Sequence, residues 1–331
     1  MERPLLMCGL IRDATMNRRE FIRRSAITTG ALLAVGILPA ANSRRIIIIR
    51  LLGGNDGLNT IVPYREELYY HDRPTLALQA HSLIRVSDTH GLHPALEPLR
   101  EAWDQGFVTV LNNVGFPVPE QTHHKAILNW HTGTLAGREG KQWTERHGMS
   151  NMLVNPESVG CIDNHITSPR SADATYPDNE FAQQLRNIAR AIQSGASHQF
   201  YQASLSGFDT HVDQGPQHAA MLKTYSSSVN ALIKDLQATD HFKETTILTY
   251  SEFGRTLEEN RLGGTHHGAG NCLFLFGEKL RVPGIFNETR VSRTDHGGIP
   301  TTIDYRRVYT TLVGQWLGGS SVSTFEPLAL F

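Results

Sequence analysis

The stretch SLSGFDTHVDQ, residues 204–214, places a carboxylate and an imidazole two positions apart, at Asp209 and His211. It follows an apolar, strand-like run that ends at Gly207. A polar turn after a strand can have this composition, but carboxylate oxygens and imidazole nitrogens are also common ligands of divalent metals. The pair is therefore either a turn or half of a metal site.

Similar groups of polar residues flank other strand-like runs. They are Asp56 after RIIIIRLL, Thr122 beyond FVTVLNN, Glu252 and Arg255 after TTILTY, and His266 and His267 before NCLFLFG. Ligands of open parallel α/β sheets bind at the carboxyl ends of the strands, so we expect these side chains to converge at one edge. A mixture of carboxylates and imidazoles suits zinc or manganese.

Each group also has a simpler interpretation. Asp56 lies in a glycine-rich turn, GGNDG, and Thr122 stands where a helix cap is expected. Glu252 and Arg255 can form a local ion pair, and the two histidines can be solvated. Because all of these polar groups are expected at the same edge of the sheet, we favour a common site over separate structural roles.

The elements that must position these residues alternate between strands and helices. Strands are expected at RIIIIRLL, FVTVLNN, QFYQASL, TTILTYSEFG and NCLFLFG, and helices at HPALEPLREAWDQG, THHKAILNWHTG, NEFAQQLRNIARAIQSG, around Leu222–Leu236 and at YRRVYTTLVGQWLGG. This alternation predicts an α/β fold, a three-layer sandwich with a mostly parallel central sheet. Residues 137–178 are polar and weakly periodic, which indicates a loop-rich excursion.

The amino-acid composition limits the classes of protein to which this chain can belong. The 331 residues are 40% hydrophobic and 8% aromatic, enough for a large core. The net charge of −1 gives no basic field for nucleic acid. The three cysteines form no CxxC pair and no disulfide framework.

The N-terminus is typical of an export signal. Arg18 and Arg19 precede a weakly apolar run of about a dozen residues, as in twin-arginine signals, and the run is shorter than the roughly 20 residues of a membrane span. We predict a signal peptide over residues 16–41, a possible mis-annotated start over 1–15, a single domain over 45–318 and a tail over 319–331. The mature protein would be periplasmic or secreted, with no stable membrane span; an uncleaved membrane anchor is the alternative.

Five motifs together resemble the bacterial family domain of unknown function 1501. They are GGNDGLNTIVPY, FDTHVDQ, YSEFGRT, GGTHHGAGN and IPTTIDYRRVYTTLVGQWLG. This family belongs to the alkaline-phosphatase-like clan, together with sulfatases. The resemblance implies an alkaline-phosphatase-like fold with one or two divalent metals at the strand ends, and a Ser or Thr nucleophile that attacks phosphorus or sulfur.

The resemblance also implies a role for individual residues. It makes Asp56 a metal ligand, Thr122 the nucleophile, Asp209 and His211 ligands of one metal, Glu252 a ligand of the other, and His267 the late histidine ligand, with His266 beside it. Arg255 could bind a tetrahedral oxyanion with its guanidinium fork.

Three departures from the family's pattern affect the second metal. His266 stands where the family has Asp, Phe253 follows Glu252 where the clan often has His, and the segment between Thr122 and Asp209 is short. Asp295-His296-Gly297 is a possible alternative to the late motif. We expect an exported metal-dependent hydrolase of a small anionic phosphate or sulfate ester. The alternatives are a transferase that uses the same nucleophile, and a non-catalytic binding or cell-envelope protein.

Overall fold

The computed structural model describes residues 43–117, 122–133, 153–154, 175–196, 198–295, 297–319 and 325–331. The chain divides into two units, residues 1–42 and residues 43–331, and only the second contains described residues. The predicted signal at 16–41 therefore lies outside the described residues, as does most of the predicted excursion at 137–178.

Among the described residues, eight strands form the main sheet, in the order β10-β5-β9-β8-β1-β7-β6 with β11 beside β5. Their bounds are β1 (Arg45–Leu52), β5 (Val108–Gly115), β6 (Leu153–Val154), β7 (Phe200–Ser206), β8 (Thr245–Ser251), β9 (Asn271–Phe276), β10 (Gly284–Ile285) and β11 (Ile303–Asp304). A smaller antiparallel sheet contains β2 (Ile61–Val62), β4 (Gly91–Leu92) and β3 (Ile84–Arg85).

Central strand β1 pairs in parallel with both β7 and β8. Strand β9 pairs antiparallel with both of its neighbours, β8 and β5, so β5 points the same way as β1. The described part of the sheet is therefore mostly parallel, as predicted. Because β9 runs backwards, the loop from β8 to β9 begins and ends at one edge, next to the carboxyl ends of β1, β5 and β7.

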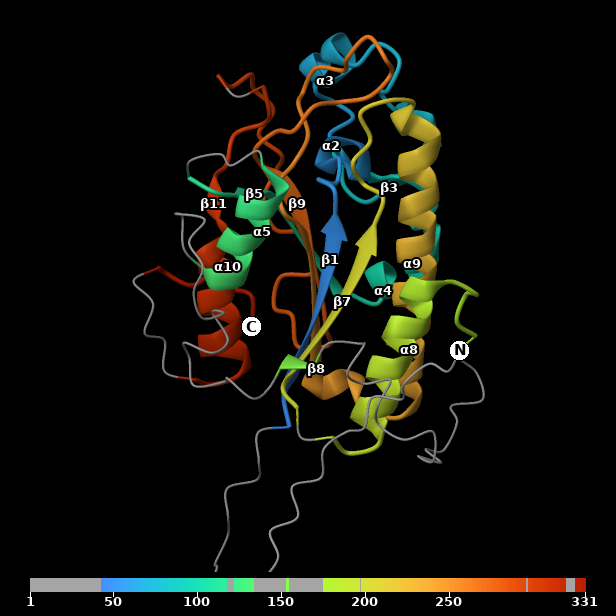
Figure 1. Cartoon of the computed structure of the whole chain (residues 1–331), viewed down its shortest axis with the longest axis vertical. Helices are drawn as coiled ribbons and strands as arrows, with labels where there is room; N and C mark the ends of the chain where they lie inside the picture. Colours follow the sequence, from blue (N-terminus) through green and yellow to red (C-terminus); the bar gives the residue numbers. More distant parts are fainter. Residues whose placement is uncertain are drawn as a thin grey trace, which may run out of the picture. The chain divides into compact units, whose positions relative to one another are not determined.

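Helices cover both faces of the sheet (Figure 1). The longer described helices are α5 (His123–Thr132), α8 (Glu180–Gln193), α9 (Gln214–Ala238) and α10 (Tyr305–Thr311), and the shorter ones are α2 (Gly57–Thr60), α3 (Glu67–Asp72) and α4 (Arg100–Asp104). Successive side chains of β1 point to opposite faces of the sheet. Ile47 and Ile49 pack in a core with α8 and α9, whereas Ile46 and Ile48 pack in a core with α5 and α10. The predicted α/β class and its three layers are confirmed.

Two predicted helices differ from the structure. The run HPALEPLREAWDQG contains Pro98, which has no N–H to donate and disfavours α geometry before it. It forms a 3₁₀ segment, Pro94–Leu99, before α4. The C-terminal helix continues after α10 as a π-helical turn, Leu312–Trp316.

The last described residues pack against the domain. Leu328 and Leu330 are buried in the core beneath α10, and the Arg281 N–H donates to the carbonyl of Leu330. No helix among the described residues is both long and apolar enough to cross a bilayer.

Candidate metal centre

Three side chains meet closely at the carboxyl edge of the sheet. Oδ1 of Asp209 lies 3.0 Å from Nε2 of His211 and 3.2 Å from Nε2 of His267. The two imidazole nitrogens are themselves 3.2 Å apart. Zinc–nitrogen bonds of about 2.0–2.1 Å in a tetrahedron place ligand atoms roughly 3.3 Å from one another. The spacing and the chemistry of these atoms therefore fit a divalent cation.

His123, the first residue of α5, lies at the other oxygen of Asp209. Its Nε2 is 3.5 Å from Oδ2 of Asp209. Ligand atoms of His123, Asp209 and His267 all lie within 4.8 Å of one another. His123 was not among the ligands predicted from the sequence. The only signal for it was its place beside Thr122, at a helix start beyond a strand.

Glu252 supports His123 from the buried side. Its side chain is 2% exposed, and its Oε1 lies 2.8 Å from Nδ1 of His123 while accepting from the Gly53 N–H at 2.8 Å. Its Oε2 accepts from the Ser251 hydroxyl. With both oxygens bonded to protein groups, Glu252 has the arrangement of a carboxylate that orients a histidine ligand through the second ring nitrogen.

Arg255 lies behind Asp209 and faces the protein interior. Its side chain is fully buried; its described hydrogen bonds go to four backbone carbonyls and to Oδ1 of Asp209, at 2.7 Å. Burial by itself raises the pKa of Asp209, but hydrogen bonds from Arg255 and His267 outweigh it and lower the pKa to about 2. Arg255 thus holds Asp209 ionised and in place, whereas from the sequence we assigned its guanidinium fork to a tetrahedral oxyanion.

The backbone loops that carry these residues approach one another closely. Gly53 has φ of 120°, and a Cβ there would lie 2.3 Å from the backbone nitrogen of Asp209. Only glycine tolerates both the dihedral angle and the contact. Phe253 is buried against the rings of His123 and His267, with centroids 4.9 and 4.5 Å away. Phe253, at the position where the family resemblance implies a histidine, therefore forms one wall of the site.

The described hydrogen bonds of the Asp56 side chain go to residues outside this group. It caps α2 by accepting from the Leu58 and Asn59 N–H groups, and its Oδ2 lies 2.7 Å from Nη1 of Arg73. Gln214 donates to the same oxygen. Burial by itself raises the pKa of Asp56, yet Arg73, together with His218 and Gln214, brings the net pKa below its usual value. The structure thus places Asp56 in a buried ion pair.

Thr122 and His266 lie at the rim. Thr122 is exposed at the N-cap position of α5, as predicted, but its side chain makes no capping hydrogen bond. His266 is exposed, and its ring centroid is 5.7 Å from that of His211. His296 of the alternative late motif lies outside the described residues.

The geometry therefore defines an α/β protein with a His- and Asp-lined centre at the carboxyl edge of its sheet. The family model "Protein of unknown function (DUF1501)" matches residues 163–292. This range includes the motifs around Asp209, Glu252 and His267, and the resemblance predicted from them is confirmed there. The motifs GGNDGLNTIVPY and IPTTIDYRRVYTTLVGQWLG lie outside the matched range.

Several solved structures resemble the chain in fold. The lipoteichoic acid synthase LtaP from Listeria monocytogenes has a TM-score of 0.46 and 10% identity, over 92% of this chain and 81% of that chain. The C-terminal periplasmic domain of EcEptC from Escherichia coli has a TM-score of 0.43 and 13% identity, over 86% and 84%. Its complex with Zn has a TM-score of 0.36 and 14% identity, over 74% and 78%. No curated protein matches the sequence.

Proposed function

We propose that this protein is an exported, metal-dependent enzyme that acts on phosphate or sulfate esters. One observation carries the proposal: the 3.0–3.2 Å triangle of Asp209 Oδ1, His211 Nε2 and His267 Nε2. Two imidazole nitrogens and a carboxylate oxygen at these distances are the donor atoms that a divalent cation takes, and we place the cation between them. We assign His123 as the fourth ligand and Glu252 as its partner.

The donor set favours zinc over manganese, because three of its four side chains are imidazoles. A bound divalent cation would polarise an oxygen of the ester and so stabilise the charge that develops during displacement. We assign one ion to this centre, since Asp56 and Glu252 are already engaged by Arg73, His123 and backbone groups.

Thr122 is the proposed nucleophile. It is exposed, adjoins His123, and stands at the N-terminus of the ten-residue helix α5. The positive end of the helix dipole favours negative charge there by about 0.3–1 kcal/mol. Its oxygen would form a bond to phosphorus or sulfur as the ester oxygen leaves, and solvent reaches the residue to accept its proton. Arg255 would act by positioning Asp209.

The specific substrate class, a small anionic ester, follows from the family resemblance and the proposed metal. Transfer to an acceptor other than water would use the same nucleophile. Export through the twin-arginine machinery remains a proposal that rests on Arg18, Arg19 and the apolar run after them.

A non-catalytic envelope or binding protein with one metal is the second candidate. It is favoured by the burial of Arg255, whose described bonds go to protein acceptors, and by the ion pair of Asp56 with Arg73. The test is the metal content of protein purified without chelator, followed by hydrolysis of a panel of phosphate and sulfate esters. Metal-dependent turnover supports the enzyme; tightly bound metal with no turnover of any ester supports the second candidate.

A further inference from the structure

A pocket lies at the opposite edge of the sheet from the metal centre. Arg44 immediately precedes β1, while Lys279 and Arg281 follow β9, which ends where β1 begins. The eight-residue β1 spans about 26 Å, so the two sites are separate. The volume of the pocket is about 560 Å³, within the range of about 300–1,000 Å³ typical of small-molecule sites.

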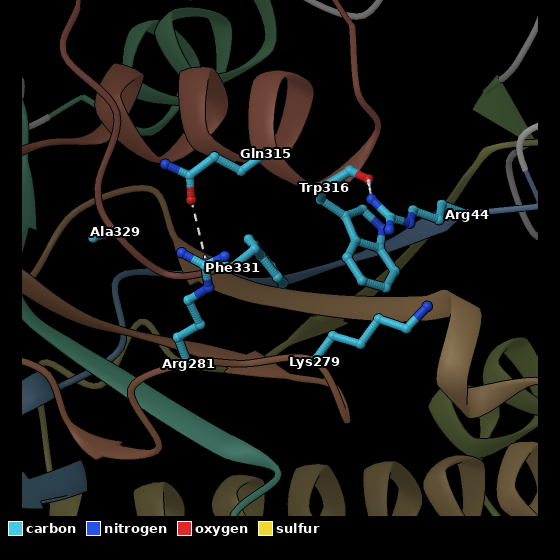
Figure 2. Close-up of a pocket in the computed structure, with 7 residues that line it drawn as sticks. All are labelled: Arg44, Lys279, Arg281, Gln315, Trp316, Ala329 and Phe331. Atoms are coloured by element: carbon cyan, nitrogen blue, oxygen red, sulfur yellow. Dashed lines mark hydrogen bonds between the residues drawn. The ribbon is translucent and has the colours of Figure 1, made fainter.

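Figure 2 shows the seven residues that line it. They are Arg44, Lys279, Arg281, Gln315, Trp316, Ala329 and Phe331. The lining has three cationic side chains and no acidic side chain. Glu244, outside the lining, pairs with Lys279 and lies 3.7 Å from Arg44. Among the described residues, Arg281 makes no ion pair with an aspartate or glutamate, so the side chains of this pocket carry more positive than negative charge.

The remaining groups add hydrogen-bond donors and apolar surface. Oε1 of Gln315 accepts from the Phe331 N–H at 3.2 Å, which leaves its amide nitrogen available to donate. Trp316 and Phe331 pack with centroids 5.2 Å apart. Arg44 and Lys279 lie over the indole ring at 5.1 and 5.8 Å. The pocket thus combines donors for an anion with aromatic rings for an apolar group.

We propose that this pocket binds a phosphate-type dianion attached to a small apolar or aromatic group. The guanidinium of Arg281 is the group free to bind phosphate oxygens as a fork, and Lys279 and Gln315 would complete the contacts. Such a group occurs on soluble phosphate monoesters and on the head groups of anionic lipids. The proposal does not depend on the activity of the metal centre.

Phenylphosphonate is a suitable soluble probe, since its C–P bond resists ester hydrolysis. Calorimetric titration of the mature protein in the presence of EDTA should show saturable binding, tighter than that of inorganic phosphate because the phenyl ring contacts Phe331. Replacing Arg281 with Ala should weaken phenylphosphonate binding by about tenfold to a hundredfold, the loss of a charge-assisted pair. Arg281→Lys should give an intermediate loss.

Matched variants locate the binding. Arg65→Ala removes another exposed arginine with no described ion pair and should leave the affinity unchanged. Asp209→Ala at the metal centre should also leave it unchanged. Co-sedimentation with phosphatidylcholine vesicles that contain phosphatidic acid tests whether the ligand is a lipid. Sedimentation that depends on Arg281 identifies a lipid head group as the ligand. Binding of phenylphosphonate that depends on Arg281, without such sedimentation, identifies a soluble ester.

Other results would overturn the proposal. Absence of saturable binding in both arms would do so. Equal losses in Arg281→Ala and Arg65→Ala would reduce the effect to general surface charge. Binding that survives Arg281→Ala but disappears in Asp209→Ala would place the phosphonate at the metal centre.

Discussion

Nδ1 of His123 and Oε1 of Glu252 lie 2.8 Å apart, although 129 residues separate them in the chain. The other ring nitrogen of His123 faces Asp209. Glu252 is therefore placed to orient His123 and fix its tautomer, and it has no oxygen left without a protein partner. This differs from the direct metal contact that the family resemblance implies for Glu252.

The Glu252→Gln variant tests that difference. Glutamine keeps the shape but loses the charge, so metal affinity should fall by about 10- to 100-fold without the site being lost. Competition with a chelator measures the affinity, and the exposed Glu258→Gln variant is the matched control. Wild-type affinity would remove Glu252 from the site. Complete loss of metal from folded protein would restore it as a direct ligand.

Replacement of Thr122 tests the proposed nucleophile. Because the side chain makes no capping bond, Thr122→Ala should not incur the loss of about 0.5–2 kcal/mol that follows removal of an N-cap. It should abolish ester turnover while metal content stays at the wild-type level, since no ligand is changed. Thr122→Ser keeps the hydroxyl and should retain substantial activity. An active Ala variant would rule out the covalent route.

Two double variants in the same N-terminal segment test the predicted export signal. Arg18→Lys with Arg19→Lys should keep the protein in the cytoplasm, because a receptor reads the arginine pair as an address. Arg23→Lys with Arg24→Lys alters the second arginine pair and should export normally. Cell fractionation measures both. Normal export of the first double variant would show that the signal is misassigned.

The parts of the fold that the sequence predicts well are those in which a residue's own neighbourhood decides its structure. The bounds of β1 match the run RIIIIRLL, since a strand buried on both faces needs a continuous apolar run. The position of Asp209 and His211 at the carboxyl edge followed from strand direction, because parallel strands bring their following loops to one edge. His267 lies there because β9, the strand that follows it, is antiparallel. Their role as ligands remains a prediction.

The pairings that were missed join residues of different structural elements. Arg73 follows α3 and pairs with Asp56, and nothing in its local pattern distinguishes it from a surface arginine. From the sequence we selected Thr122 as a site residue and missed its neighbour His123. Which of the two side chains lies near Asp209 depends on the orientation of α5. Such contacts depend on the packing of α3 and α5, which sequence periodicity does not specify.

The buried ion pair of Asp56 and Arg73 predicts a large effect on stability. Arg73→Met leaves Asp56 as an unpaired buried charge and should cost about 3–5 kcal/mol in the free energy of unfolding. Adding Asp56→Asn should recover much of that loss. Urea denaturation measures both. Arg100→Met, which breaks an exposed pair with Asp104, should cost no more than about 1 kcal/mol.

Metal content separates this role of Asp56 from the one that the family resemblance implies. If Asp56 is structural, Asp56→Asn combined with Arg73→Met should bind as much metal as the wild type. Loss of metal from that folded double variant would return Asp56 to the ligand set.

Three largely buried histidines predict a loss of stability in acid. Burial lowers the pKa of His218 to about 3, and of His93 and His131 to about 4. Between these values and about 6.5, the unfolded chain binds protons that the folded protein excludes. Stability is therefore complete above about pH 6.5 and falls as the pH drops toward 4, by at most about 1.4 kcal/mol per pH unit for each histidine.

His218→Gln isolates one of these contributions. Nε2 of His218 lies 2.9 Å from Oδ1 of Asn55, and a glutamine amide can donate a similar bond without titrating. The variant should lose some stability at pH 7, yet its free energy of unfolding should fall less steeply with acid than that of the wild type between pH 6 and 4. Urea unfolding at a series of pH values measures the slope, and the exposed His81→Gln variant should keep the wild-type slope. An unchanged slope in His218→Gln would mean that His218 is protonated in the folded protein despite its burial.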